Sequence, residues 1–363
     1  MHDGRPLRFT ASMTNLAQNI AAVLAPARER GGRLGLAWTT LARIGGVTLA
    51  VLIVGLFFEI RTHGQLLISD NILTILRGLS TTAIMGFGLT VVIVAAEIDL
   101  SFAAVYGLST NIVAVLWLTH GFPIYVAILI AFVAAILVGV FNAFFTSVVK
   151  IPSFIATLGS STLVFGLTLW IGQTQNLSYQ YPPTGQTVAH GQVTFFRNLG
   201  SGALPGKFPE QGIWALVLLV VFSLLLTRTL FGFRLKAIGG SRAAAEVVRL
   251  PVKKYTFLAF AICACTACLA GLLDFSFVGT AGPNDGSVYL FPVFAAVIIG
   301  GASLAGGKGS AIGTMMGALL LAVLANGVAL IAAGPFASQL LLGTVTVGAV
   351  VIDRLTSRQR SLT

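Results

Sequence analysis

Runs of apolar residues, each close to the length of a bilayer-spanning helix, recur along almost the whole chain. A transmembrane α-helix needs about 20 mostly apolar residues, and ten stretches approach or reach that length. We therefore predict an all-α fold, a polytopic bundle of about ten transmembrane helices. The spans are predicted at residues 41–58, 71–96, 102–119, 123–148, 153–173, 212–229, 255–277, 288–304, 311–333 and 336–352.

The charge content agrees with a membrane protein. Only 9% of the 363 residues are charged, whereas soluble domains carry about 25%. A water-soluble protein with so few charges could not cover its surface. We predict a cytoplasmic tail at 1–40, a transmembrane domain at 41–353 and a second tail at 354–363.

The distribution of Lys and Arg predicts the orientation. If the N-terminus is cytoplasmic, 18 of the 22 basic residues fall in cytoplasmic segments, as the positive-inside rule requires. Both termini are then cytoplasmic, segment 174–211 is an external loop and segment 230–254 is internal. The net charge of +11 follows from this rule. Because the basic residues lie between the apolar runs and not in one stripe, no nucleic-acid partner is indicated.

The internal segment 230–254 is basic and contains a predicted short helix. Ser241 is its expected N-cap and the helix is expected to run to about Arg249, with Pro251 beyond its end. Such a helix would present small residues to a soluble partner. The alternative is a connecting loop held to anionic lipid by its charges.

A glycine-rich stretch at 300–311, GGASLAGGKGSA, resembles a phosphate-binding loop in part. The P-loop pattern is G-x-x-x-x-G-K-[ST], and Gly307-Lys308 matches its centre. Ala302 replaces the first glycine, and Gly309 replaces the hydroxyl residue that would bind Mg²⁺. The stretch therefore misses the pattern at both ends, and we do not expect it to bind nucleotide.

Polar residues within or beside the apolar runs are candidates for a translocation path, since such residues usually face a cavity or the bundle interior. The carboxylates could instead lie at the hydrated end of a span, where Asp99 or Ser101 would cap the next helix. The asparagines could instead form hydrogen bonds between helices. Asp274 is ambiguous in the same way. The path candidates are Glu97, Asp99, Ser101, Asn142 and Asn326.

No catalytic or metal site is expected. The histidines His2, His63, His120 and His190 lie far apart in tails and loops. The three cysteines lie close together in ICACTACLA, at Cys263, Cys265 and Cys268. This run could be a metal-binding fragment, but packing of small polarizable residues in a helix is the favoured interpretation.

Four stretches in series resemble the ribose-type sugar permeases, the membrane subunits of bacterial ATP-driven importers of the ATP-binding-cassette class. Together they extend the resemblance over roughly residues 70–353. The stretches are EIDLSFAAVYGL at 97–108, GVFNAFFTSVVKIPSFIATLG at 139–159, FGFRLKAIGGSRAAAEVVRLPV at 231–252 and IIGGASLAGGKGSAIGT at 298–314.

The resemblance implies a multi-pass permease subunit of the bacterial inner membrane that carries a monosaccharide or related polyol. It implies a second permease chain, identical or homologous, a cytoplasmic ATPase that holds ATP and Mg²⁺, and a periplasmic substrate-binding protein, with lipid around the helices. This subunit itself would be no enzyme and would hold no cofactor. Segment 230–254 becomes the coupling loop to the ATPase. The implied coupling residues are Gly239, Gly240, Ser241, Arg242, Ala244, Ala245 and Arg249.

The chain departs from the family pattern at four places. Glu97 stands where Gly is usual, and Phe102-Ala103 replaces Val-Gly. Ala243 stands where Glu is usual and Arg249 where Gly is usual. Two other functions stay open. One is an ion-coupled secondary transporter that uses Glu97, Asp99 and Asp274 as ion or proton sites, and the other is a membrane-embedded enzyme, which the scattered histidines disfavour.

Overall fold

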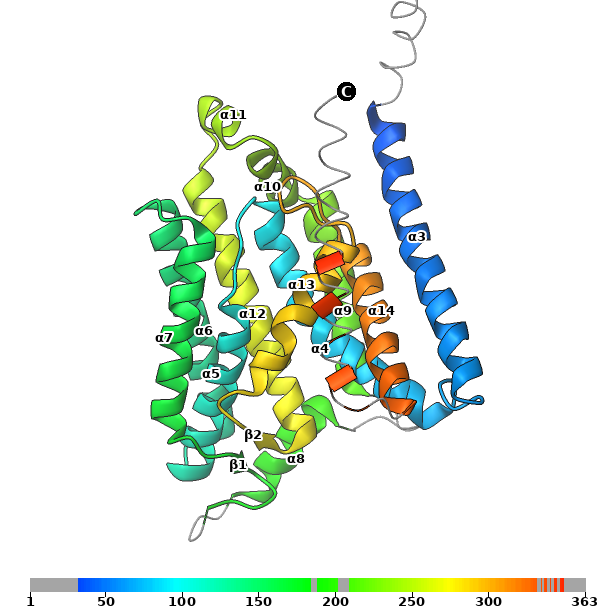
Figure 1. Cartoon of the computed structure of the whole chain (residues 1–363). Coiled ribbons are helices and arrows are strands. Elements are labelled where there is room, and N and C mark those ends of the chain that lie inside the picture. The colour runs from blue at the N-terminus through cyan, green and yellow to red at the C-terminus, as the bar shows by residue number, and fades with distance from the viewer. Residues whose placement is uncertain are drawn as a thin grey trace, which may run out of the picture. The chain divides into compact units, whose positions relative to one another are not determined.

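A computed structural model describes residues 32–183, 188–201 and 209–331, with scattered positions between 334 and 348. Within these residues it contains twelve α-helices, two strands of two residues each, a π-helical turn and a 3₁₀ turn (Figure 1), which confirms the all-α prediction. The chain divides into two units, Met1–Gly46 and Val47–Thr363. The features described below belong to the second unit.

The elements follow one another along the chain in an almost uninterrupted series of helices. They are α3 (Gly32–Arg61), α4 (Ser69–Val94), α5 (Phe102–Ala114), η1 (Val115–Thr119), α6 (Ile124–Ser147), α7 (Ser153–Gly172), β1 (Leu177–Ser178), α8 (His190–Gly200), α9 (Glu210–Arg228), α10 (Leu230–Gly240), α11 (Arg242–Val247), α12 (Val252–Val278), β2 (Thr280–Ala281), η2 (Asp285–Tyr289), α13 (Leu290–Ile299) and α14 (Ala311–Leu330).

Seven helices of the described residues are long and apolar enough to cross a membrane: α4, α5 with η1, α6, α7, α9, α12 and α14. They correspond to seven of the ten predicted spans. The span predicted at 41–58 falls inside α3, and the one at 336–352 lies largely outside the described residues. The prediction at 288–304 differs from the structure, because α13 has only ten residues. At 1.5 Å per residue α13 is about 15 Å long, and together with η2 the apolar helical stretch Asp285–Ile299 is still shorter than each of the seven spans.

Prolines determine where four of these helices begin. Pro123, Pro152, Pro209 and Pro251 immediately precede α6, α7, α9 and α12. A proline has a fixed φ and lacks a backbone N–H, and a helix can begin at a residue without that N–H group. The same residue inside any of these helices would break it.

The helices divide into an inner and an outer group. In its most apolar window α4 is 89% buried, whereas α7 is 22% buried. Around α4 and α12 pack α5, α6, α9 and α14. The outer faces of α6, α7 and α9 present large apolar side chains such as Leu137, Trp170 and Val220, as expected for surfaces that contact lipid tails.

The segment 174–211 is more ordered than the loop we predicted. It contains β1, which pairs antiparallel with β2 in the register Leu177↔Ala281 and Ser178↔Thr280. It also contains α8, whose Phe196 is buried and forms edge contacts with the rings of Trp117 and Phe275. Helix α8 was missed because it buries only one apolar stripe and is too short and polar to resemble a span.

Candidate functional site

The link between α4 and α5, residues 95–101, is a short non-helical segment that we call the α4–α5 linker. It begins with Ala96 in the left-handed region at φ 62°, which turns the chain sharply out of α4. The first turn of α7 then holds the linker from the side. The N–H of Ile98 donates to Ser153 Oγ at 3.0 Å, and the N–H of Leu100 donates to Thr157 Oγ1 at 3.1 Å.

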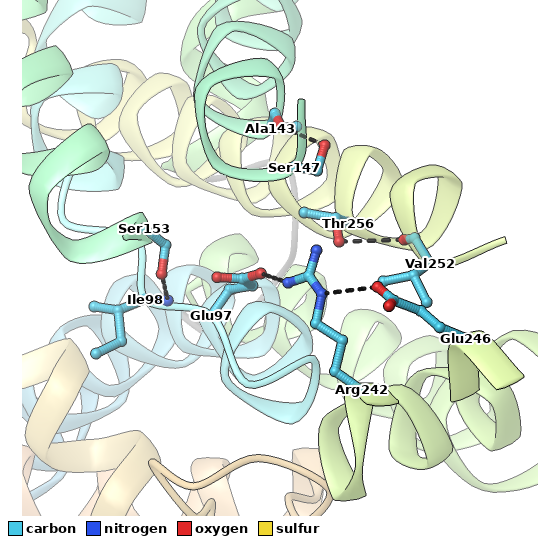
Figure 2. A network of polar contacts seen from close by, with 9 residues as sticks. All are labelled: Glu97, Ile98, Ala143, Ser147, Ser153, Arg242, Glu246, Val252 and Thr256. Atoms are coloured by element: carbon cyan, nitrogen blue, oxygen red, sulfur yellow. Dashed lines mark hydrogen bonds and ion pairs between the residues drawn. The ribbon is translucent and has the colours of Figure 1, made fainter. Parts of the chain in front are cut away.

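The linker is joined to α11 by an ion pair (Figure 2). Arg242 Nη1 lies 2.8 Å from Glu97 Oε1, and the Glu97 side chain is only 8% exposed. Arg242 Nε also lies 3.6 Å from Glu246 Oε1 on the next turn. A buried carboxylate is costly unless it is paired, so Arg242 stabilises Glu97 in this position. Glu97 therefore joins the linker to α11.

Asp99, Ser101 and Asn142 form a second, fully buried network. Asp99 Oδ1 accepts from the Ser101 N–H at 2.8 Å and from Ser101 Oγ at 2.7 Å. Asn142 Nδ2 on α6 donates to Ser101 Oγ at 2.7 Å. Asp99 thus supports the start of α5, one of the alternatives that the sequence left open.

The glycine-rich loop 300–310 packs against the end of α4 and the end of α10. The Gly307 N–H donates to Val94 O at 2.9 Å. A Cβ on Gly239 would lie 1.9 Å from Val94 O, and one on Gly306, at φ 85°, would lie 2.5 Å from the Ala96 Cβ. The glycines therefore allow three backbones to approach closely.

Segments α10 and α11 form two short helices with polar caps. Thr229 caps α10 through the Gly232 N–H at 3.2 Å, and Ser241 caps α11 through the Ala244 N–H at 3.3 Å. The short helix with Ser241 as N-cap is thus confirmed. Burial lowers the pKa of Lys236 on α10.

The residues of α11 divide between the two faces of the helix. Ala244 is exposed, but Ala245 is buried at 3% exposure, so only the first can contact a partner directly. Val247 and Val248 are 82% and 68% exposed. Arg249, also exposed, has φ 56°, a conformation that glycine adopts most easily. We call residues 230–250 the coupling segment, after the role that the resemblance implies for residues 230–254.

A cavity of about 540 Å³ lies between α11, the linker and the α6–α7 turn. Its wall carries both signs of charge, from Glu97, Arg242 and Glu246 together with Lys150 and Lys253. The first turn of α7 completes the wall with Ser153. Sequence reasoning missed Ser153 and Thr157 as linker contacts, although the helix-start signal of Pro152 was present in the quoted motif.

Two other candidates lie apart from this site. Asn326 on α14 exchanges two hydrogen bonds with Asn71 on α4, at 2.8 and 2.9 Å, which is interhelical pairing. Asp274 lies near the other end of α12, where it accepts from the hydroxyls of Tyr106 and Tyr289. Cys263, Cys265 and Cys268 are free thiols in α12. Among the described residues, no three His, Cys, Asp or Glu side chains gather into a possible metal site.

Comparison with known proteins places these features in a family. A family model described as "Branched-chain amino acid transport system / permease component" matches residues 71–350. The xylose transport system permease protein of Escherichia coli strain K12 is 30% identical, over 85% of this chain and 91% of its own length. The ribose import permease protein of Bacillus subtilis strain 168 is 32% identical, over 78% and 84%. A probable ABC transporter permease of Sinorhizobium fredii is 31% identical, over 92% and 94%.

The range matched by the family model includes all four stretches on which the resemblance was based, and the xylose and ribose permeases confirm that resemblance. The long apolar helices and the glycine-rich turns that bring α4, α10 and the 300–310 loop together lie within the matched range. The chain is a multi-pass membrane protein that belongs to the branched-chain amino acid transport system / permease component family, as a permease of the ATP-binding-cassette class.

Proposed function

We propose that this chain is the membrane subunit of an ATP-driven sugar importer, and that the coupling segment transmits the movement of a cytoplasmic ATPase to the α4–α5 linker. The observation that carries the proposal is the ion pair between Arg242 on α11 and buried Glu97 in the linker, 2.8 Å apart. It connects an exposed short helix with the linker between α4 and α5.

The surface of the coupling segment is suited to a protein partner. It exposes Leu230, Phe233, Val247 and Val248, and exposed apolar side chains gathered on one segment mark interaction sites. A helix that only rested on anionic lipid would need its basic residues free, whereas Arg242 is engaged with two carboxylates. The proposal therefore favours protein docking over lipid anchoring.

A displacement of α11 by the ATPase would act on the linker through one of the contacts described above. Of these contacts only the one between Arg242 and Glu97 joins α11 to the linker. Ser153 and Thr157 join the linker backbone to α7, and the Gly307 N–H joins the 300–310 loop to the end of α4. Linker movement would then change the relation between α4, α5 and α7. Alternating access in transporters requires such a relative movement of helices around a fixed site.

The substrate class follows from the relatives, of which one is a xylose permease and another a ribose permease. In the proposed complex a second permease chain, a binding protein on the outer side and an ATPase on the inner side complete the importer. ATP and Mg²⁺ belong to the ATPase, because the glycine-rich loop of this chain is occupied by contacts to its own α4 and α10.

Energy coupling tests the proposal directly. Uptake of radiolabelled D-xylose and D-ribose is measured in cells that express the chain with its native partners, compared with cells from which the chain is deleted. Arsenate, which depletes ATP, should abolish uptake, whereas an uncoupler in cells with ATP maintained should not. The opposite pattern would indicate the ion-coupled carrier and contradict the proposal.

Docking is tested by adding volume on α11. Ala244→Trp should abolish uptake with membrane insertion intact, since packed interfaces tolerate added volume poorly. Ala189→Trp, the same change at an exposed position in the 174–211 segment, is the matched control and should transport normally. Normal uptake by the Ala244 variant would remove α11 from the docking surface.

A further inference from the structure

A second polar cavity, of about 370 Å³, opens between α5, the C-terminal part of α12 and η2. It lies far from the coupling segment, because α11 leads into the N-terminal end of α12 and Asp274 lies four residues before its C-terminal end. Figure 1 shows α11 and β2 at opposite ends of α12. Its polar lining includes Tyr106, Asp274, Asn284, Asp285, Ser287 and Tyr289.

The carboxylate of Asp274 is positioned by two tyrosines. The Tyr106 hydroxyl donates to Asp274 Oδ2, and the Tyr289 hydroxyl donates to the same oxygen at 3.0 Å. Both of these bonds use Oδ2, so neither occupies Oδ1. The two rings lie 5.3 Å apart and are tilted by 40°. A carboxylate inside a membrane helix is expensive and usually functional, and this one lines a cavity.

The opposite wall is held firmly against α5 by glycines. A Cβ on Gly286 would lie 1.9 Å from Ala103 O, and one on Gly107 would lie 2.8 Å from Pro283 O. Asp285 accepts from the Gly282 N–H at 2.6 Å, which fixes the turn that precedes η2. The cavity is therefore formed by packed backbone and does not depend on a mobile loop.

The chemistry of the lining selects the ligand. Among the described residues that line the cavity, none is Lys or Arg, while two are Asp. A sugar phosphate would place its anionic group among these carboxylates without a cationic partner. An amino acid could pair its ammonium group with an Asp, but its carboxylate would have no cationic partner in the lining. A neutral polyhydroxylated molecule would instead donate O–H groups to the carboxylates and the Asn284 amide oxygen. The volume is at the small end of the roughly 300–1,000 Å³ typical of ligand sites.

We propose that this cavity is a sugar subsite of the permease, with Asp274 accepting hydrogen bonds from sugar hydroxyls and the rings of Tyr106 and Tyr289 forming its apolar wall. This inference rests on the proposed function and adds the residues that contact the substrate. On the predicted orientation the cavity faces the outer side, where a binding protein would release its sugar. It also distinguishes a sugar from the amino acids named in the family description.

Direct binding to the full-length chain in lipid nanodiscs tests the subsite. The probes are D-xylose, D-ribose and L-leucine, followed by saturation-transfer difference NMR. A few hydrogen bonds in an open cavity predict a Kd of about 1 mM for the sugars. Signal from at least one sugar and none from L-leucine is the expected result. Signal from L-leucine alone would overturn the ligand class, and no signal from any probe would overturn the subsite.

Matched variants locate the bound sugar. Asp274→Asn should weaken binding about tenfold, because a hydrogen bond to a charged group is lost. Asp70→Asn, the same change at an exposed position at the start of α4, should bind as the wild type does. Asn284→Ala changes an exposed lining residue and should weaken binding severalfold even if Asp274→Asn fails to fold. Unchanged binding in the Asn284 variant and in a folded Asp274 variant would place the sugar elsewhere.

Uptake measurements separate this inference from the proposed function. If Asp274→Asn transports at the wild-type rate in an arsenate-sensitive manner, the importer assignment stands and the subsite is wrong. If wild-type uptake survives ATP depletion, the importer assignment itself is wrong. Slowed but still arsenate-sensitive uptake by Asp274→Asn supports both.

Discussion

Arg242 and Glu97 stand 145 positions apart in the sequence and make a direct contact. Glu97 is nearly buried while Arg242 is 43% exposed, so much of the arginine charge remains screened by water. The pair therefore contributes less to stability than a fully buried ion pair would. Its importance lies in geometry, since it fixes the position of α11 relative to the linker.

A double-mutant cycle measures this contact. Arg242→Ala leaves Glu97 without its partner and should lower the free energy of unfolding by about 1–3 kcal/mol. Glu97→Gln removes the charge and keeps the shape, and the double variant should be more stable than the sum of the single effects predicts. Thermal unfolding of the purified chain supplies the stabilities. Strictly additive effects would show that the two side chains do not interact.

Arg249 provides a second test at the residue scale. At φ 56° a non-glycine residue is strained by roughly 1–2 kcal/mol. Arg249→Gly should therefore preserve or slightly raise the melting temperature, whereas Arg249→Val, β-branched and bulky, should lower it. If both variants were equally destabilised, the loss of the guanidinium group would be the cause. The backbone conformation at position 249 would then not explain the change in melting temperature.

Among the elements, the end of α10 gives the sharpest contrast between neighbouring residues. A Cβ on Gly239 would lie 1.9 Å from Val94 O, whereas one on Gly240 would meet nothing within 4 Å. Gly239→Ala should thus force α10 away from α4 and abolish ATP-coupled uptake, and Gly240→Ala should leave uptake substantially intact. Uptake assays with membrane levels matched by immunoblot decide the point. Equal activity in the two variants would contradict the close packing of α10 on α4.

Long apolar helices could be predicted from sequence because their signal is local, and seven predicted spans are such helices in the structure. The span predicted at 288–304 differs from the structure, where α13 ends at Ile299 and Gly301, at φ 94°, turns the chain. The apolarity of the sequence alone does not reveal that end or that turn. The sequence motifs did identify Arg242 in the coupling loop and Glu97 in the linker as candidate residues. That Arg242 reaches Glu97 could not be read from the sequence, since no local rule relates positions so far apart.

Polar residues show the same division between local and non-local information. Asp99 and Ser101 are two positions apart, and a cap at the start of α5 was among the readings that the sequence allowed. Asp274 was noticed but left ambiguous. Its partners Tyr106 and Tyr289 come from α5 and η2, and only the packing of those elements against α12 brings the three side chains together.

For the whole molecule, the sidedness of the bundle is the property on which both proposals depend. The distribution of Lys and Arg predicts that α11 faces the cytoplasm and that 174–211 faces outward. Tyr181 and Val247 are 83% and 82% exposed, so a cysteine at either position would be equally accessible to a reagent on its own side. With Cys263, Cys265 and Cys268 replaced by alanine, Tyr181→Cys should react with a membrane-impermeant maleimide in cells whose outer membrane has been permeabilised. Val247→Cys should react only after the inner membrane is opened. Labelling of Val247→Cys in intact spheroplasts would show that the orientation is the reverse of the predicted one. The sugar cavity would then face the cytoplasm. The coupling segment would face the outer side, where no ATPase could dock.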